Sequence, residues 1–132
     1  MKYLLDTHTF LWSVCNTKAL SKRARESIIN PENEIYVSAI TLWEISIKTR
    51  INKLSLAPLE TEDLIPAAEQ MQFELIELTP AEAISYHHLA EKDHSDPFDR
   101  MLIWQAISRG MGLISKDRAF KKFVPTGLNL LW

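Results

Sequence analysis

The apolar and polar positions of this chain form short apolar runs separated by stretches with helical periodicity. The runs predict strands at residues 2–5, 35–37, 73–78, 113–114 and 127–132, the last at an edge of the sheet. Helices are predicted from residue 9 onward and at residues 22–30, 39–52, 59–72, 80–89, 97–109 and 118–123. Because strands and helices alternate, the pattern predicts a three-layer α/β fold with a mostly parallel central sheet.

Sequence signals at the helix ends support these boundaries. Ser38 can cap the helix at 39–52, and Thr79-Pro80-Ala81-Glu82 is a capping-box pattern with proline at the first helical position. Asp96-Pro97 opens the helix at 97–109, and Gly110 ends it.

Four acidic residues stand at unusual places in this pattern. Asp6 and Asp117 follow predicted strands, and open parallel sheets bind ligands beyond the carboxyl ends of their strands. Glu44 falls within an apolar helix stripe, and Asp99 lies one turn before the apolar pair Leu102-Ile103. The stripe around Glu44 is predicted to consist of Ile40, Trp43, Ile47 and Ile51. A charge on a buried face is costly unless it is paired or bound to a metal.

Each acid also has a purely structural interpretation. Asp6 can form an Asx turn, and Asp117 can cap residues 118–123. Glu44 can pair with Lys48, and Asp99 suits the positive N-terminus of its helix. These interpretations do not explain why all four acids should meet at one end of the sheet. Clustered carboxylates repel one another, whereas Mg²⁺ or Mn²⁺ would turn the cluster into a site of hard oxygen ligands.

Composition and charge narrow the classes of function. The 132 residues suit a single domain, 1–132, and the net charge of −2 offers no overall basic footprint for nucleic acid. Attraction of a nucleic acid would require a local patch, a bound metal ion or another subunit. The single Cys15 excludes an internal disulfide, and the four histidines lack the i, i+4 helical pair of a zinc site. With no signal peptide and no long apolar run, we expect a cytoplasmic protein that does not enter a membrane.

The residues around the four acids form motifs that resemble those of PIN-domain ribonucleases, in particular the VapC-type toxins of type II toxin–antitoxin pairs. The motifs are Leu5-Asp6-Thr7-His8, residues 38–45 (SAITLWEI), residues 94–103 (HSDPFDRMLI) and Ile114-Ser115-Lys116-Asp117. They occur in the family's order, and the resemblance spans nearly the whole chain.

The resemblance implies a Rossmann-like PIN fold and an endoribonuclease that depends on Mg²⁺ or Mn²⁺. The family's catalytic and metal-holding acids fall on Asp6, Glu44, Asp99 and Asp117, with hydroxyls beside them at Thr7 and Ser115 and a second candidate ligand at Asp96. The resemblance also implies an RNA substrate, a homodimer and a small antitoxin protein that blocks the site.

Basic residues beside these acids are candidate RNA contacts, namely Arg100, Lys116, Arg118 and Lys121. A salt bridge is at least as good an interpretation of Arg100, and a solvated helix face is an equal alternative for the other three.

Two rival functions remain open on the residues alone. An α/β phosphatase would use Asp6 as its nucleophile, but the second acid expected two residues later is His8. A metal-binding domain without turnover would be either receiver-like or a non-catalytic PIN protein. A receiver-like domain would be favoured by an aspartate at another strand end, and Val37-Ser38 and Leu78-Thr79 offer none.

Overall fold

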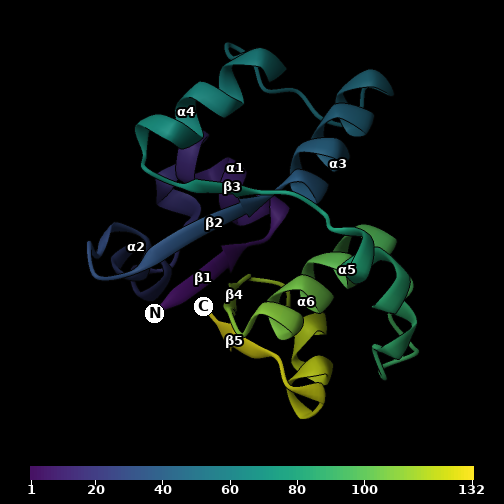
Figure 1. Cartoon of the computed structure of the whole chain (residues 1–132). Helices are drawn as coiled ribbons and strands as arrows, with labels where there is room; N and C mark the ends of the chain where they lie inside the picture. The colour runs from purple at the N-terminus through teal and green to yellow at the C-terminus, as the bar shows by residue number, and fades with distance from the viewer.

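The structure, a computed structural model, describes residues 1–132 and contains one five-stranded sheet with helices on both faces (Figure 1). Across the sheet the strands are β3 (Glu74–Ile76), β2 (Glu34–Ser38), β1 (Lys2–Leu5), β4 (Gly112–Ile114) and β5 (Asn129–Leu131). All four neighbouring pairs are parallel. The predicted three-layer α/β fold is therefore confirmed, with the first strand of the chain central and the last at an edge.

The helices lie close to their predicted ranges. They are α1 (Thr7–Cys15), α2 (Lys22–Ile29), α3 (Ala39–Arg50), α4 (Leu64–Gln70), α5 (Pro80–Ser85) and α6 (Pro97–Arg109). Short 3-10 helices are η1 (Thr17–Ala19), η2 (Thr61–Asp63), η3 (Tyr86–His88) and η4 (Arg118–Thr126). The predicted helix at 80–89 is found in two pieces, α5 and η3, and the region 59–72 forms η2 and α4. None of the helices has the length and apolar character needed to cross a membrane.

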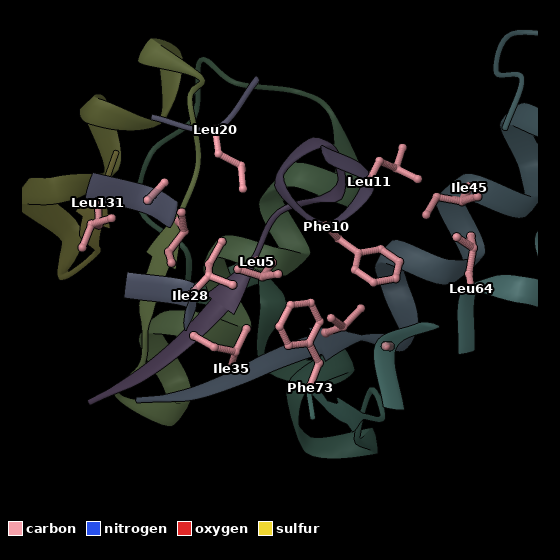
Figure 2. Packing of buried hydrophobic residues seen from close by; sticks show 14 residues of the cluster. Leu5, Phe10, Leu11, Leu20, Ile28, Ile35, Ile45, Leu64, Phe73 and Leu131 are labelled. Atoms are coloured by element: carbon pink, nitrogen blue, oxygen red, sulfur yellow. The ribbon is translucent and has the colours of Figure 1, made fainter. Parts of the chain in front are cut away.

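Two hydrophobic cores lie on opposite faces of the sheet because neighbouring side chains of a strand point to opposite sides. Leu5 of β1 belongs to the core that α1, α2 and α4 cover, where Phe10 and Phe73 pack edge to face at 6.5 Å between ring centroids (Figure 2). Leu4, the residue before it, packs in the other core with Leu102 of α6 and Phe120 of η4. The sheet is thus buried on both faces, and its carboxyl-terminal edge stays open.

The predicted helix caps are present. The Ser38 hydroxyl accepts a hydrogen bond from the Ile40 N–H, and Thr79 and Glu82 form the reciprocal capping box at the start of α5. Gly110 ends α6 with a left-handed φ of 66°, which favours glycine because that backbone conformation strains other residues.

The predicted apolar stripe of α3 is confirmed at Ile40, which is buried, and is wrong at Trp43 and Ile51. The buried side chains of this helix are Ile40, Thr41, Glu44 and Ile45. Trp43 and Ile51, two members of the expected stripe, are 59% and 48% exposed. The buried face is therefore rotated toward Thr41 and Ile45, because α3 packs against α1 as well as α6. Glu44 is buried, but as part of this different face.

Candidate active site

A cavity of about 380 Å³ opens at the carboxyl-terminal edge of the sheet, beyond β1 and β4. Five carboxylates line it, those of Asp6, Glu44, Asp96, Asp99 and Asp117. They come from the ends of two strands, from α3 and from the start of α6. The structure thus brings together all four acids singled out in the sequence, along with Asp96.

Asp6 follows the last residue of β1 and begins α1. Its carboxylate accepts hydrogen bonds from the Thr9 N–H at 2.9 Å and from the Ser115 hydroxyl at 2.5 Å. Burial raises the pKa of the Asp6 carboxyl, while the hydrogen bonds from Ser115 and Thr9 oppose that change. The expected turn at Asp6 is present, and the same carboxylate lines the cavity.

Glu44 is almost fully buried, with 3% of its surface exposed. The Thr7 hydroxyl donates to one carboxylate oxygen at 2.6 Å, and the Lys48 ammonium lies 2.5 Å from the other. The hydrogen bond with Glu44 raises the pKa of Lys48 against its partial burial, and the negative charges of Asp96 and Asp99 raise it further. The Glu44–Lys48 pair considered from the sequence therefore exists, and it lies inside the acidic cavity.

Asp99 lies in the first turn of α6, half-buried, with one carboxylate oxygen 2.9 Å from Nε2 of His94. Burial raises the pKa of the Asp99 carboxyl to about 6. The hydrogen bond with His94 acts in the opposite direction, and the charges of Asp96 and Glu44 raise the pKa further. Asp96 caps α6 by accepting from the N–H groups of Phe98 and Asp99, so its second oxygen remains available to the cavity.

Asp117 stands at the exposed rim of the cavity. Its carboxylate accepts a hydrogen bond from the Ala119 N–H at 2.9 Å and caps η4, as its structural interpretation anticipated. The Asp117 N–H donates to the Ser115 hydroxyl, which itself donates to Asp6. Ser115 therefore links the two acids that follow β1 and β4.

The donor set of the cavity suits a hard divalent cation. Carboxylate oxygens are the ligands that Mg²⁺ and Mn²⁺ prefer, and no thiol lines the cavity. As the side chains stand, no three His, Cys, Asp or Glu residues lie close enough to form a metal-binding cluster. Burial raises the pKa of Asp6 and Asp99 and so disfavours their ionised forms, which a bound cation would stabilise.

The sequence analysis did not assign two residues to the site: Lys48, which lines the cavity, and His94, which contacts the cavity residue Asp99. The His94 ring packs edge-on against Phe120 and Phe123, with ring centroids at 5.7 and 5.8 Å, and this packing fixes it beside Asp99. Its place in the motif HSDPFD, five residues before Asp99, was the available signal. For Lys48, the spacing of four residues from Glu44 was the signal.

Arg100 lies outside the acidic cavity and makes no salt bridge, contrary to the structural alternative drawn from the sequence. Its guanidinium donates to the carbonyls of Leu89, Glu91 and His94 and to the hydroxyl of Tyr86. Arg100 thus fastens the segment before α6 to that helix, which leaves few donors for a phosphate.

The other three basic candidates gather at the rim. Lys116 lines the acidic cavity, and Lys116, Arg118 and Lys121 together line an adjoining cavity of about 410 Å³. Arg23 of α2 also lines this second cavity and was not singled out in the sequence.

A parallel five-stranded α/β sheet with carboxylates gathered beyond its central strands has the architecture of a PIN-like domain. The PIN domain family model matches residues 3–124 of the chain, and the protein belongs to this family.

Individual relatives agree with this assignment. The chain is 29% identical over 118 residues to Ribonuclease VapC22 of Mycobacterium tuberculosis, covering 89% of this chain and 88% of that protein. Its fold is similar to that in the crystal structure of VapBC2 from Rickettsia felis bound to a promoter DNA fragment, with a TM-score of 0.70 and 18% identity. This match covers 99% of this chain and 98% of that chain. The fold is also similar to that of VapBC-5 from Mycobacterium tuberculosis, a member of the VapBC family of toxin–antitoxin systems, with a TM-score of 0.54 and 18% identity. This match covers 98% of this chain and 95% of that chain.

Proposed function

We propose that this protein is a metal-dependent endoribonuclease and the toxin of a toxin–antitoxin pair. The convergence of Asp6, Glu44, Asp99 and Asp117 on one cavity is the observation that carries the proposal. Membership of the PIN family and the similarity to a ribonuclease named VapC22 support it.

The four acids would hold Mg²⁺ or Mn²⁺, with Asp96 as a further candidate ligand beside Asp99. When bound, such an ion supplies Lewis-acid polarisation of a phosphoryl oxygen and increases the acidity of water. The carboxylates of the chain would orient the attacking water and accept its proton. Thr7 and Ser115 support this role because each donates a hydrogen bond to one of the acids, Glu44 and Asp6 respectively.

Lys48 and His94 hold two of the carboxylates in position. The Lys48 ammonium offsets the charge of Glu44, and the His94 ring fixes one oxygen of Asp99. Both contacts limit the rotation of carboxylates that would otherwise repel one another.

The proposal extends to partners and to the residues that form the domain. We infer that the chain acts on RNA as a single PIN domain over residues 1–132, works as a homodimer in the cytoplasm, and is blocked by a cognate antitoxin protein. The similar VapBC structures support the antitoxin as a partner.

Cleavage of mixed cellular RNA by the purified chain tests the activity. We expect discrete fragments with Mg²⁺ or Mn²⁺ and none in EDTA, and we expect Asp99→Asn to lower the rate about a hundredfold or more. Asp93→Asn is the matched control, because Asp93 is exposed and does not line the cavity. If the folded chain binds Mn²⁺ in calorimetry but cleaves no RNA, the proposal fails and the binding-domain alternative stands.

A further inference from the structure

The acidic cavity by itself repels RNA. Five carboxylates line it, the whole chain carries a net charge of −2, and the phosphates of RNA are negative. A bound metal ion would offset part of this repulsion, and cations of the chain near the cavity can add attraction. The adjoining second cavity is lined by such cations. The two cavities share Lys116 and Asp117 as lining residues, so they meet at the end of β4.

Four cations line this second cavity, which we call the basic cavity: Arg23, Lys116, Arg118 and Lys121. All four are exposed, and none forms an ion pair within the chain. In contrast, Lys48 and Arg109 pair with glutamates, and Arg100 is bound to backbone carbonyls. Because none of these cations is paired with a carboxylate of the chain, they can bind phosphates without breaking an ion pair.

Two tryptophans join the cavities. Trp12 lines the acidic cavity and Trp132 lines the basic one, and their ring centroids lie 5.9 Å apart with a tilt of 55°. Both rings are half-buried, and the Lys116 ammonium lies 5.8 Å from the centroid of Trp12. Aromatic rings beside a row of cations are the arrangement that binds single strands, in which bases stack on the rings and phosphates contact the cations.

We propose that the basic cavity binds single-stranded RNA next to the phosphate that is cut, with a base stacked on Trp132. This inference rests on the proposed ribonuclease function. A single strand is specified because base pairing and stacking in a duplex cover the faces of the bases that Trp132 would contact.

Fluorescence anisotropy with a labelled single-stranded RNA of mixed sequence tests the charge part of the inference. All proteins carry Asp99→Asn, so that binding is measured without cleavage. We expect the added double substitution Arg23→Gln/Lys121→Gln to weaken binding about tenfold. The slope of log affinity against log salt should fall by about 1.4, since a single strand loses about 0.7 per phosphate contact.

The matched control is Arg25→Gln/Lys122→Gln, which removes two exposed cations from the same elements, α2 and η4, outside the basic cavity. This control should keep the parent affinity. If the two double variants lost RNA affinity equally, or if neither lost any, the inference would be overturned. The proposed function would still stand in that case, provided that the Asp99→Asn parent binds RNA. No RNA binding by the parent and no cleavage by the native chain would overturn both.

Substitution of Trp132 tests the stacking part. We expect Trp132→Leu to weaken binding of the single strand about fivefold to tenfold and to leave binding of the same RNA in duplex form unchanged. Thermal melting verifies that the variant is folded. If Trp132→Leu weakened binding of the single strand and of the duplex equally, or did not weaken binding of the single strand, no base would stack on the Trp132 ring.

Discussion

Each carboxylate of the acidic cavity is oriented by neighbouring donors, but Glu44 alone has a lysine or arginine partner within 4 Å. Asp6 and Asp99 show the consequence, because burial raises the pKa of both. Keeping these two carboxyl groups ionised lowers the free energy of unfolding. A bound cation would stabilise the ionised groups and so raise the free energy of unfolding again.

At the scale of the residue, we predict that Asp99→Asn stabilises the protein in EDTA near pH 7.5. The pKa of Asp99 is about 6 in the folded chain and 3.8 ordinarily, so the folded chain holds this proton more tightly. The stability that this group contributes is present below about pH 4 and is lost as the pH rises to about 6. Urea denaturation should therefore show that the Asp99→Asn variant is more stable than the native chain near pH 7.5 and equally stable near pH 4.

Asp93→Asn serves again as the control and should change stability little at either pH. If Asp99→Asn had the same stability as the native chain near pH 7.5 in EDTA, burial would not oppose ionisation of Asp99. With Mn²⁺ present, the native chain should gain more stability than the Asp99→Asn variant.

At the scale of the element, Glu82 joins α5 to α6. Its carboxylate accepts from the Arg109 guanidinium at 2.6 and 2.9 Å, from Gln105, and from the N–H of Thr79. Gln105 in turn accepts from the Ser38 hydroxyl at 2.6 Å. This network ties α5, α6 and the end of β2 together and sets the position of α6, whose first turn carries Asp99.

We predict that Glu82→Gln destabilises the fold at neutral pH but not in strong acid. Burial opposes ionisation of Glu82, but the hydrogen bonds from Arg109, Thr79 and Gln105 outweigh it and lower the pKa from 4.5 to about 2. The stability from this carboxylate is present above about pH 4.5 and is lost as the pH falls toward 2. The difference in urea midpoint between native and variant should narrow over that range, and a difference independent of pH would contradict the prediction.

At the scale of the molecule, large apolar side chains remain in contact with solvent. Trp43 lies in an apolar groove between α3, α5 and α6, where its ring packs edge-on against Phe98 at 5.3 Å. Ile29 of α2 is 69% exposed on another part of the surface. Exposed apolar surface of this kind is typical of protein interfaces.

We predict that the purified chain has the mass of two chains in light scattering, consistent with the proposed homodimer. Trp43→Lys should shift the mass to one chain, because a charge in the apolar groove would have to be desolvated on association. Ile29→Lys is the control and should leave the dimer intact. A single-chain mass for the native protein at high concentration would contradict the prediction.

The limits of sequence reasoning are clearest on α3 and α6. Hydropathy placed Trp43 and Ile51 on the buried face of α3, but they are exposed, since the helix turns toward α1 and buries Thr41 instead. Arg100 was considered as a phosphate contact or a salt-bridge partner, and neither identity nor spacing indicated that backbone carbonyls would surround it. Both outcomes depend on which segments pack beside the helix.

By itself the sequence determined the order of strands and helices, the caps at Ser38, Thr79 and Asp96, and the acids that follow the strands, because these depend on local periodicity and hydrogen bonding. Only the tertiary structure decided which side chains meet. It placed the locally formed Glu44–Lys48 pair inside the cavity, His94 against Asp99, and both Arg23 and Lys121 on the lining of a second cavity. Arg23 and Lys121 are far apart along the chain, and only the folded sheet brings α2 and η4 to the same edge.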